Sequence, residues 1–181
     1  MRIRIPKHVC LLAGLGLAFA ALSGCTARVA SMIPEATTSQ TAQPNSPLYQ
    51  NILLTDVGGE ESTLEWAEVG SAEFRESLVQ TLDRAKFLSS DPNAPFQLKA
   101  FIIEVRRPTA AFTVSVNSFV RYTLLRSKDR GVIFDDVLQA TRTATLGDEF
   151  IGIERMRIAV EGAMQANIST LLERLRRTVV P

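Results

Sequence analysis

Apolar and polar residues alternate along three stretches of the second half of the chain, which is the period of a β-strand. The stretches cover residues 96–105, 112–124 and 132–145. The middle one is the clearest, because one face of it carries Phe112, Val114, Val116, Val120, Tyr122 and Leu124. Its other face is mostly polar. In the last stretch the residues expected to point inward are Phe134, Leu138, Ala140 and Ala144. These patterns predict three consecutive strands.

Two details refine these strands. The alternation of the first strand shifts between Ile102 and Ile103, which indicates a β-bulge or a strand that is apolar on both faces. Residues 127–131, Ser-Lys-Asp-Arg-Gly, are polar and lie between the second and the third stretch. They predict a hairpin loop, so the second and third strands are expected to be antiparallel.

Apolar residues repeat every three or four positions in two other segments, the period of an amphipathic helix. One helix is expected to begin at Ser71 as its N-cap and to carry the apolar stripe Phe74, Leu78, Leu82 and Ala85. The other is expected after Asp148, also as a cap, with the stripe Ile153, Met156, Val160, Met164, Ile168, Leu171 and Leu175. A short strand over residues 51–56 and one helical turn over 62–66 are predicted ahead of them.

The order strand, helix, three strands, helix indicates an α+β domain of β-α-β-β-β-α topology. Each helix has a single apolar stripe. Both stripes are buried together if the two helices pack on the same face of the sheet. We therefore expect a mostly antiparallel four-stranded sheet with two helices on one face, formed by a single domain over residues 49–181.

Residues 1–24 have the composition of a secretory signal peptide. Arg2, Arg4 and Lys7 give a cationic start, and an apolar run follows over residues 9–21. That run is too short to span a bilayer as a helix, which takes about 20 residues. We expect the segment to be removed from the mature protein.

The sequence Leu22-Ser23-Gly24-Cys25 resembles the lipobox of bacterial lipoproteins. The resemblance implies cleavage before Cys25 and attachment of acyl chains, such as palmitate, to that residue. Several chains would hold the protein on a membrane essentially permanently, since one chain alone anchors only marginally. Thr26 stands where an aspartate would commonly signal retention in the inner membrane. This favours the periplasmic face of the outer membrane.

Residues 25–48 are rich in Ser, Thr, Gln, Ala and Pro, and we expect a flexible tether behind the acylated Cys25. A flexible chain of this length has a typical reach of about 25 Å and a stretched limit of about 80 Å. Such a tether would let the domain work close to the membrane or well away from it.

Charge and composition exclude several classes of function. The 181 residues include 20 Lys and Arg against 19 Asp and Glu, and loss of Arg2, Arg4 and Lys7 leaves a mature net charge of −2. That balance disfavours a nucleic-acid partner. His8 is the only histidine, and Cys10 and Cys25 are the only cysteines.

The mature chain would therefore lack both an imidazole and a free thiol, so triad chemistry and typical zinc sites are not expected. The acidic residues Glu60, Glu61, Glu65 and Glu68 are better explained as a solvated loop than as a metal site. We expect no enzyme, no cofactor and no metal.

Three groups of residues are candidates for contacts. Phe101, Ile103 and Phe119 are expected on the sheet face without helices, where an apolar cluster is typical of a partner site. An equally weighted alternative is that Trp66 and its loop cover them. Arg174, Arg176 and Arg177 could bind lipid phosphates, although solvation and favourable interaction with the helix C-terminus are the simpler interpretation. Asn167 is expected to bond a nearby backbone group.

Four core patterns carry a family resemblance over residues 50–178. They are Phe74-Arg-Glu-Ser-Leu78, Phe96-Gln-Leu-Lys-Ala100, Val120-Arg-Tyr-Thr-Leu124 and Gly162-Ala-Met-Gln-Ala-Asn-Ile168. With the element order and the acylated terminus, the chain resembles small βαβββα bacterial outer-membrane lipoproteins, including the LPS-assembly lipoprotein (LptE-like) group. That group plugs a β-barrel and assists lipopolysaccharide delivery.

The resemblance implies a non-catalytic binding or assembly module in the biogenesis or transport of envelope lipid. Its expected partners are the membrane, a protein (an outer-membrane barrel or a transport complex) and, as a further candidate, lipid or LPS. Two alternatives remain open. One is an accessory lipoprotein of a transporter that spans the periplasm, and the other is an enzyme of envelope glycolipid metabolism such as an acyltransferase.

Overall fold

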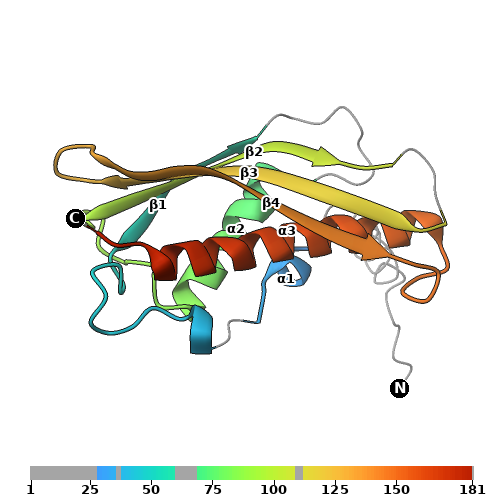
Figure 1. The fold of residues 1–181 in the computed structure, drawn as a ribbon, viewed down its shortest axis with the longest axis horizontal. Coiled ribbons are helices and arrows are strands. Elements are labelled where there is room, and N and C mark those ends of the chain that lie inside the picture. Colours follow the sequence, from blue (N-terminus) through green and yellow to red (C-terminus); the bar gives the residue numbers. More distant parts are fainter. Residues whose placement is uncertain (1–27, 36–37, 60–68, 109–111, 181) are drawn as a thin grey trace, which may run out of the picture.

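The structure is a computed structural model that describes residues 28–35, 38–59, 69–108 and 112–180. Its main elements follow the predicted order (Figure 1). They are β1 (Ile52–Gly59), α2 (Ser71–Arg84), β2 (Phe96–Arg106), β3 (Val114–Arg126), β4 (Val132–Ala144) and α3 (Gly152–Arg177). A short helix α1 (Val29–Met32) and a 3-10 turn η1 (Thr38–Gln40) precede them. The prediction of an α+β fold is confirmed.

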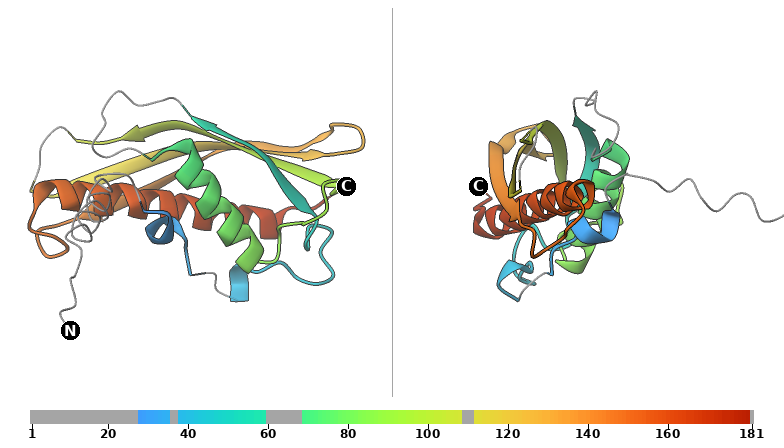
Figure 2. Two further views of the ribbon diagram at one scale, coloured as in Figure 1. Left: turned by 180° about the vertical axis from the view of Figure 1, so that it is seen from behind. Right: turned by 90° about the vertical axis from the view of Figure 1, so that its right-hand side faces the viewer.

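The four strands form one sheet in the order β1-β2-β3-β4. β1 runs parallel to β2, and the other neighbours are antiparallel, so the sheet is mixed. A parallel pair needs a crossover between its strands, and α2 supplies it. Figure 2 shows both long helices on the same side of the sheet, as expected. The register of β2 shifts between Ile102 and Glu104, which confirms the predicted bulge.

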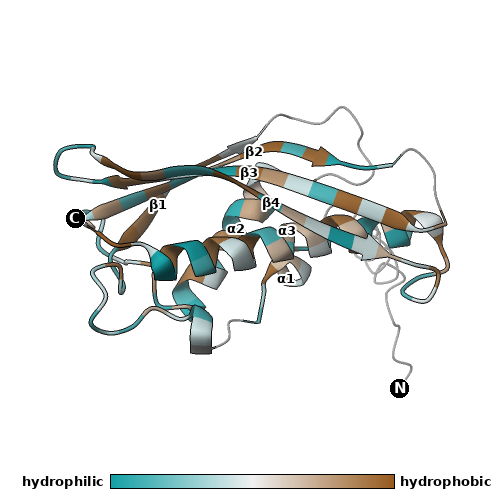
Figure 3. Cartoon of the chain, in the orientation of Figure 1, coloured by the Kyte–Doolittle hydropathy of each residue, from teal (hydrophilic) through white to brown (hydrophobic). Residues whose placement is uncertain are grey.

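Apolar side chains of the helices and the sheet form the core between these two layers. The stripe of α2 is fully buried at Phe74, Leu78 and Leu82, and it packs with inward residues of the strands such as Leu98 and Tyr122. β3 shows the alternation most clearly, as successive apolar and polar bands along the strand (Figure 3). The strand period of two therefore sets which face is buried.

A buried polar network connects β3 to α3. Tyr122 donates its hydroxyl hydrogen to Asn167 Oδ1 at 3.0 Å, and Ser118 Oγ donates to the carbonyl of Ala163 at 3.0 Å. Asn167 Nδ2 donates to the carbonyl of Leu138 at 2.9 Å. The expectation that Asn167 bonds a backbone group is therefore confirmed. Burial of these groups is tolerated because each has a partner.

The start of each long helix differs from the prediction. Gly70, not Ser71, is the N-cap of α2, and the cap has no side-chain hydrogen bond. Asp148 does not cap α3, which begins at Gly152 behind Ile151. Its carboxylate instead accepts the backbone N–H of Thr145 at 2.8 Å and closes the preceding turn. The helical turn predicted over residues 62–66 lies outside the described residues.

The expectation of a flexible tether is wrong for residues 28–35 and 38–48, because they pack against the domain. Met32 and Leu48 are completely buried, and Ser77 Oγ contacts the carbonyl of Val29 at 3.3 Å. Gln165 of α3 donates to the carbonyl of Ile33 at 3.1 Å. Figure 1 places α1 beneath α3, on the side away from the sheet. The segment covers a surface that α2 and α3 create only when they pack side by side.

Candidate functional site

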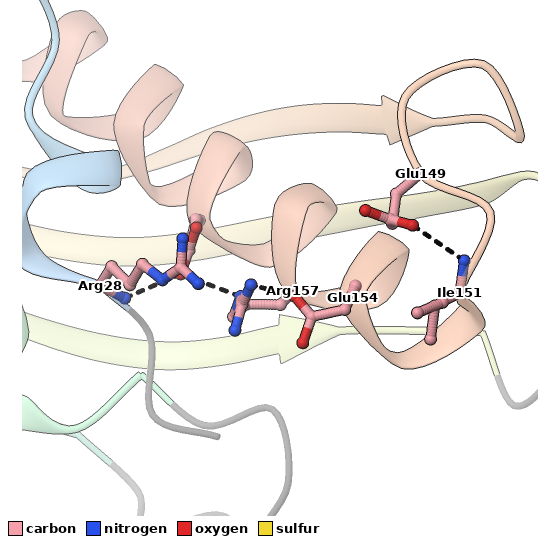
Figure 4. A network of polar contacts seen from close by, with 6 residues as sticks. Arg28, Glu149, Ile151, Glu154 and Arg157 are labelled. Atoms are coloured by element: carbon pink, nitrogen blue, oxygen red, sulfur yellow. Dashed lines mark hydrogen bonds and ion pairs between the residues drawn. The ribbon is translucent and has the colours of Figure 1, made fainter. Parts of the chain in front are cut away.

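The first described residue is fixed to α3. The backbone N–H of Arg28 donates to Glu161 Oε1 at 2.7 Å (Figure 4). The carboxylate of Glu161 is almost fully buried, and Arg157 Nε lies 3.7 Å from the same oxygen. Arg157 also pairs with Glu154. A buried carboxylate is destabilising unless it is hydrogen-bonded and paired with a positive charge. The backbone N–H of Arg28 supplies one of the hydrogen bonds to Glu161.

A second arginine orders the loop in front of α3. Arg155 is buried, and its Nη1 donates to the carbonyls of Glu149 and Phe150 at 2.7 and 3.0 Å. Glu149 Oε1 accepts the N–H of Ile151 at 3.0 Å. The hydrogen bonds from Thr145, assisted by the charge of Arg142, hold the pKa of Asp148 below its usual value. The loop over residues 145–151 therefore has a defined conformation.

This loop and its neighbours expose several large apolar side chains, which we call the apolar tip. Phe112 is 79% exposed, Phe150 82% and Ile151 58%. Leu146 and Ile153 are also exposed. They gather at one end of the molecule because Val114 pairs with Ala144, which brings the flanking Phe112 and Leu146 to the same edge, and Ile151 is the N-cap of α3 there.

The sequence analysis missed the apolar tip because it assigned two of its members to the core. Phe112 was expected on the inward face of a strand, but β3 begins only at Val114. Ile153 was expected in the buried stripe of the last helix, but it is 41% exposed. The available signal was the density of apolar residues in the sequence Phe150-Ile-Gly-Ile153, where a loop would be expected to be polar.

Cys25 lies outside the described residues, but its position in the sequence limits its distance from the domain. Arg28 follows it by three positions, and an extended chain spans at most about 11 Å over three residue steps. This limit replaces the reach of about 80 Å that a free tether over residues 25–48 would have had. An anchor at Cys25 would keep the domain directly at the membrane surface.

The sheet face opposite the helices carries part of the predicted contact surface. Phe101 is 46% exposed and lies over Gly58, where an added Cβ would meet its ring at 3.3 Å. Phe119 is partly buried, with the guanidinium of Arg106 5.3 Å from its ring centroid. Ile103 is also partly buried, and it falls within the bulge. Trp66 lies outside the described residues, so cover by its loop stays a prediction.

The three C-terminal arginines are in different situations. Arg174 Nε lies 2.6 Å from Asp136 Oδ2, and its guanidinium is 4.6 Å from the centroid of the Phe134 ring. Arg177 is exposed and pairs loosely with Glu173 at 3.7 Å, and Arg176 is exposed. Arg174 is therefore engaged within the domain, and contact with phosphates stays a prediction for Arg176 and Arg177.

The described parts of the chain also bear on other kinds of site. They contain no group of three His, Cys, Asp or Glu side chains placed to hold a metal ion. Within those same ranges, no helix combines the length and apolar character that crossing a bilayer requires. A depression near the hairpin end is lined by residues such as Ser89 and Asp91, but these side chains accept backbone N–H groups and shape the turn.

Comparison with known proteins identifies the fold. No family profile and no curated protein sequence matches the chain. A Xanthomonas campestris protein of the DUF330 family superposes with a TM-score of 0.57 at 13% identity, covering 76% of this chain and 90% of that protein. PelC of Paraburkholderia phytofirmans, described as a dodecamer, superposes with a TM-score of 0.50 at 15% identity, covering 75% and 94%.

A protein of Caulobacter crescentus described as a candidate lipoprotein gives a TM-score of 0.48 at 16% identity, covering 71% and 89%. The first two similarities establish a fold shared with bacterial proteins. They do not confirm the resemblance to the LptE-like group.

Proposed function

We propose that this chain is a lipid-anchored envelope protein whose domain is a non-catalytic binding or assembly module. The observation that carries the proposal is the spacing between Cys25 and Arg28. A lipobox-like sequence ends only three residues before a backbone N–H that is fixed to the buried Glu161. The chain thus passes almost directly from the modification site into the domain, as expected if acylation holds the domain at a surface.

The anchor is tested by growing cells that express the full-length chain with an alkyne-bearing fatty acid. Wild type should incorporate the label and sediment with membranes. The Cys25→Ser variant should lose the label and most of the membrane association. Intact Met1 chains with free thiols, recovered from the soluble fraction, would overturn the proposal.

The finer part of the proposal places the protein at the periplasmic face of the outer membrane, where it takes part in biogenesis or transport of LPS or another envelope lipid. Thr26 after the modified cysteine supports the outer membrane. Density-gradient separation of the two membranes tests this, and recovery of the labelled protein with the inner membrane would contradict it.

The uncovered face of the sheet supports the binding role. Phe101 and Val137 are both about half exposed there, on either side of Arg121 in the register of β2, β3 and β4. Arg121 Nε lies 3.9 Å from Asp135 Oδ1, and exposed apolar groups beside such an ion pair are suited to a protein partner. We propose that this face binds an envelope protein, with an outer-membrane barrel as first candidate and a periplasm-spanning transport complex as the alternative.

A photo-crosslinking amino acid at Phe101 tests the partner in membranes of the cells that make the protein. The matched control carries the same amino acid at Lys128, which is exposed in the hairpin between β3 and β4. A barrel captured only from position 101 supports the first candidate, and an inner-membrane transporter supports the second. Equal capture from both positions would contradict a binding role for this face.

A glycolipid enzyme such as an acyltransferase is the less favoured alternative. Its general acid or base would have to be a residue other than histidine, because the expected mature sequence contains no histidine. Turnover of an acyl donor by the purified protein would establish it.

A further inference from the structure

We propose that the apolar tip inserts into the lipid surface to which Cys25 is attached. This inference rests on the proposed acyl anchor, and it adds a second contact with the membrane. The tip consists of the five exposed apolar residues defined above: Phe112, Leu146, Phe150, Ile151 and Ile153.

The position of the anchor brings the tip within reach of the same surface. Glu161, which holds Arg28, lies ten residues along the chain from Ile151, or about 15 Å along a helix. The link from Arg28 to Cys25 adds at most about 11 Å. A bilayer close enough to receive acyl chains from Cys25 is therefore close enough to receive the end of the domain where α3 begins.

The tip is held in a conformation that keeps its apolar groups outward. The guanidinium of Arg155 binds the carbonyls of Glu149 and Phe150 from the inside of the loop. Phe150 and Ile151 consequently remain exposed although the buried residues Met156 and Val160 follow them within α3. Aromatic and aliphatic groups presented in this way partition into the boundary between headgroups and acyl chains.

The charges around the tip indicate which lipid headgroups the tip can bind. Asp148 lies 3.7 Å from Arg142, and Glu149 accepts a backbone N–H, so each acidic group has a partner within the domain. The tip carries no excess of basic residues that would require anionic lipid. The surface that receives the tip is therefore zwitterionic phospholipid.

Insertion of the tip would also orient the domain. The hairpin over residues 127–131 lies at the opposite end of the long axis from the start of α3 (Figures 1 and 2). It would point away from the membrane, together with the C-terminal end of α3.

A single thiol probe tests the inference in the full-length acylated protein. Once residues 1–24 are removed and Cys25 is acylated, an introduced cysteine is the only free thiol. Gly147→Cys places an environment-sensitive fluorophore between Leu146 and Phe150, leaves all five tip residues intact and has room for a side chain. Lys128→Cys is the matched control at the far hairpin.

Both labelled proteins are reconstituted into phosphatidylcholine vesicles that contain a lipid quencher. We expect quenching at position 147 to exceed that at position 128 by at least about twofold, because a membrane-inserted group meets the quencher directly. Replacing Phe150 and Ile151 by Ser in the Gly147→Cys background should abolish the difference while the melting temperature and the mass of the acylated chain stay unchanged.

Equal quenching at both positions in chains of confirmed acylated mass would overturn the tip inference and leave the anchor intact. If the fluorophore at position 147 is protected from solvent in native membranes but not in pure lipid vesicles, the inference is also overturned. The tip would then contact a membrane protein and not the lipid. A mass without acyl chains would instead contradict the proposed function.

Discussion

The backbone N–H of Arg28 donates a 2.7 Å hydrogen bond to Glu161, a residue 133 positions further along the chain. This contact joins the start of the described domain to its last helix. Removal of the carboxylate in Glu161→Ala should lower the free energy of unfolding by about 1.5–3 kcal/mol, because Arg28 loses its acceptor and Arg157 loses a buried partner. Chemical denaturation measures this change.

Trypsin cleavage after Arg28 provides a second readout, and it should accelerate in Glu161→Ala. The control is Glu173→Ala, whose carboxylate is exposed and pairs loosely with Arg177. Its stability should change by less than about 0.5 kcal/mol. Equal effects of the two variants would show that Glu161 does not retain the N-terminal segment.

Gly162 lies where α3 meets β4, and a Cβ there would lie 2.7 Å from Arg142 Cγ. In a free helix Gly→Ala stabilises by about 1 kcal/mol. Here Gly162→Ala should give no such gain, because the side chain of Arg142 must move. The same substitution in an Arg142→Ala background should recover about 1 kcal/mol.

A double-mutant cycle of unfolding free energies measures this coupling. The Arg142→Ala background is itself expected to be nearly neutral, since Arg142 is half exposed and its pair with Asp148 is at 3.7 Å. Additive effects would refute the steric explanation.

Burial raises the pKa of the Tyr122 hydroxyl well above its usual value. Because the folded pKa is above the unfolded one, the stabilisation is complete below pH of about 10 and is lost as pH rises further. Stability should then fall by up to about 1.4 kcal/mol per pH unit from this group. Urea titrations from pH 8 to 11.5 test the slope.

Tyr122→Phe is the control for that slope. At neutral pH it should be less stable by about 1–2 kcal/mol, because Asn167 Oδ1 loses its donor. Above pH 10 the gap to wild type should narrow, and a constant gap would contradict the assignment.

Arg174 combines a close ion pair with Asp136 and a stacked position over Phe134. Arg174→Ala should cost about 1–2 kcal/mol of stability. Arg176→Ala should be neutral within about 0.5 kcal/mol, since that side chain is exposed. Thermal unfolding of both variants distinguishes a structural role from a surface role.

Much of the sheet and of the buried helical stripes was predictable from periodicity. Val120, Tyr122 and Leu124 are buried on one face of β3, and the stripes of α2 and α3 are buried nearly as expected. Periodicity was less informative at the ends of elements. Ile153 continues the apolar stripe of α3 but lies beyond the sheet that would cover it.

The candidate sites were predicted less well than the fold. Phe101 is exposed as expected, but Phe119 is partly covered by Arg106. Exposure depends on neighbours from other strands, which a single-strand pattern does not contain. The apolar tip went unrecognised for the same reason, because Phe112 reaches the residues of the segment 146–153 only through the pairing of Val114 with Ala144.

The sequence by itself determined the order of elements, the inward faces and the lipobox-like pattern that ends at Cys25, because each depends on residues close together in the chain. Tertiary structure alone decided that residues 28–35 and 38–48 pack on the helices instead of forming part of the expected tether. Met32 and Leu48 have no repeating pattern around them, and the surface that buries them exists only once α2 and α3 lie together.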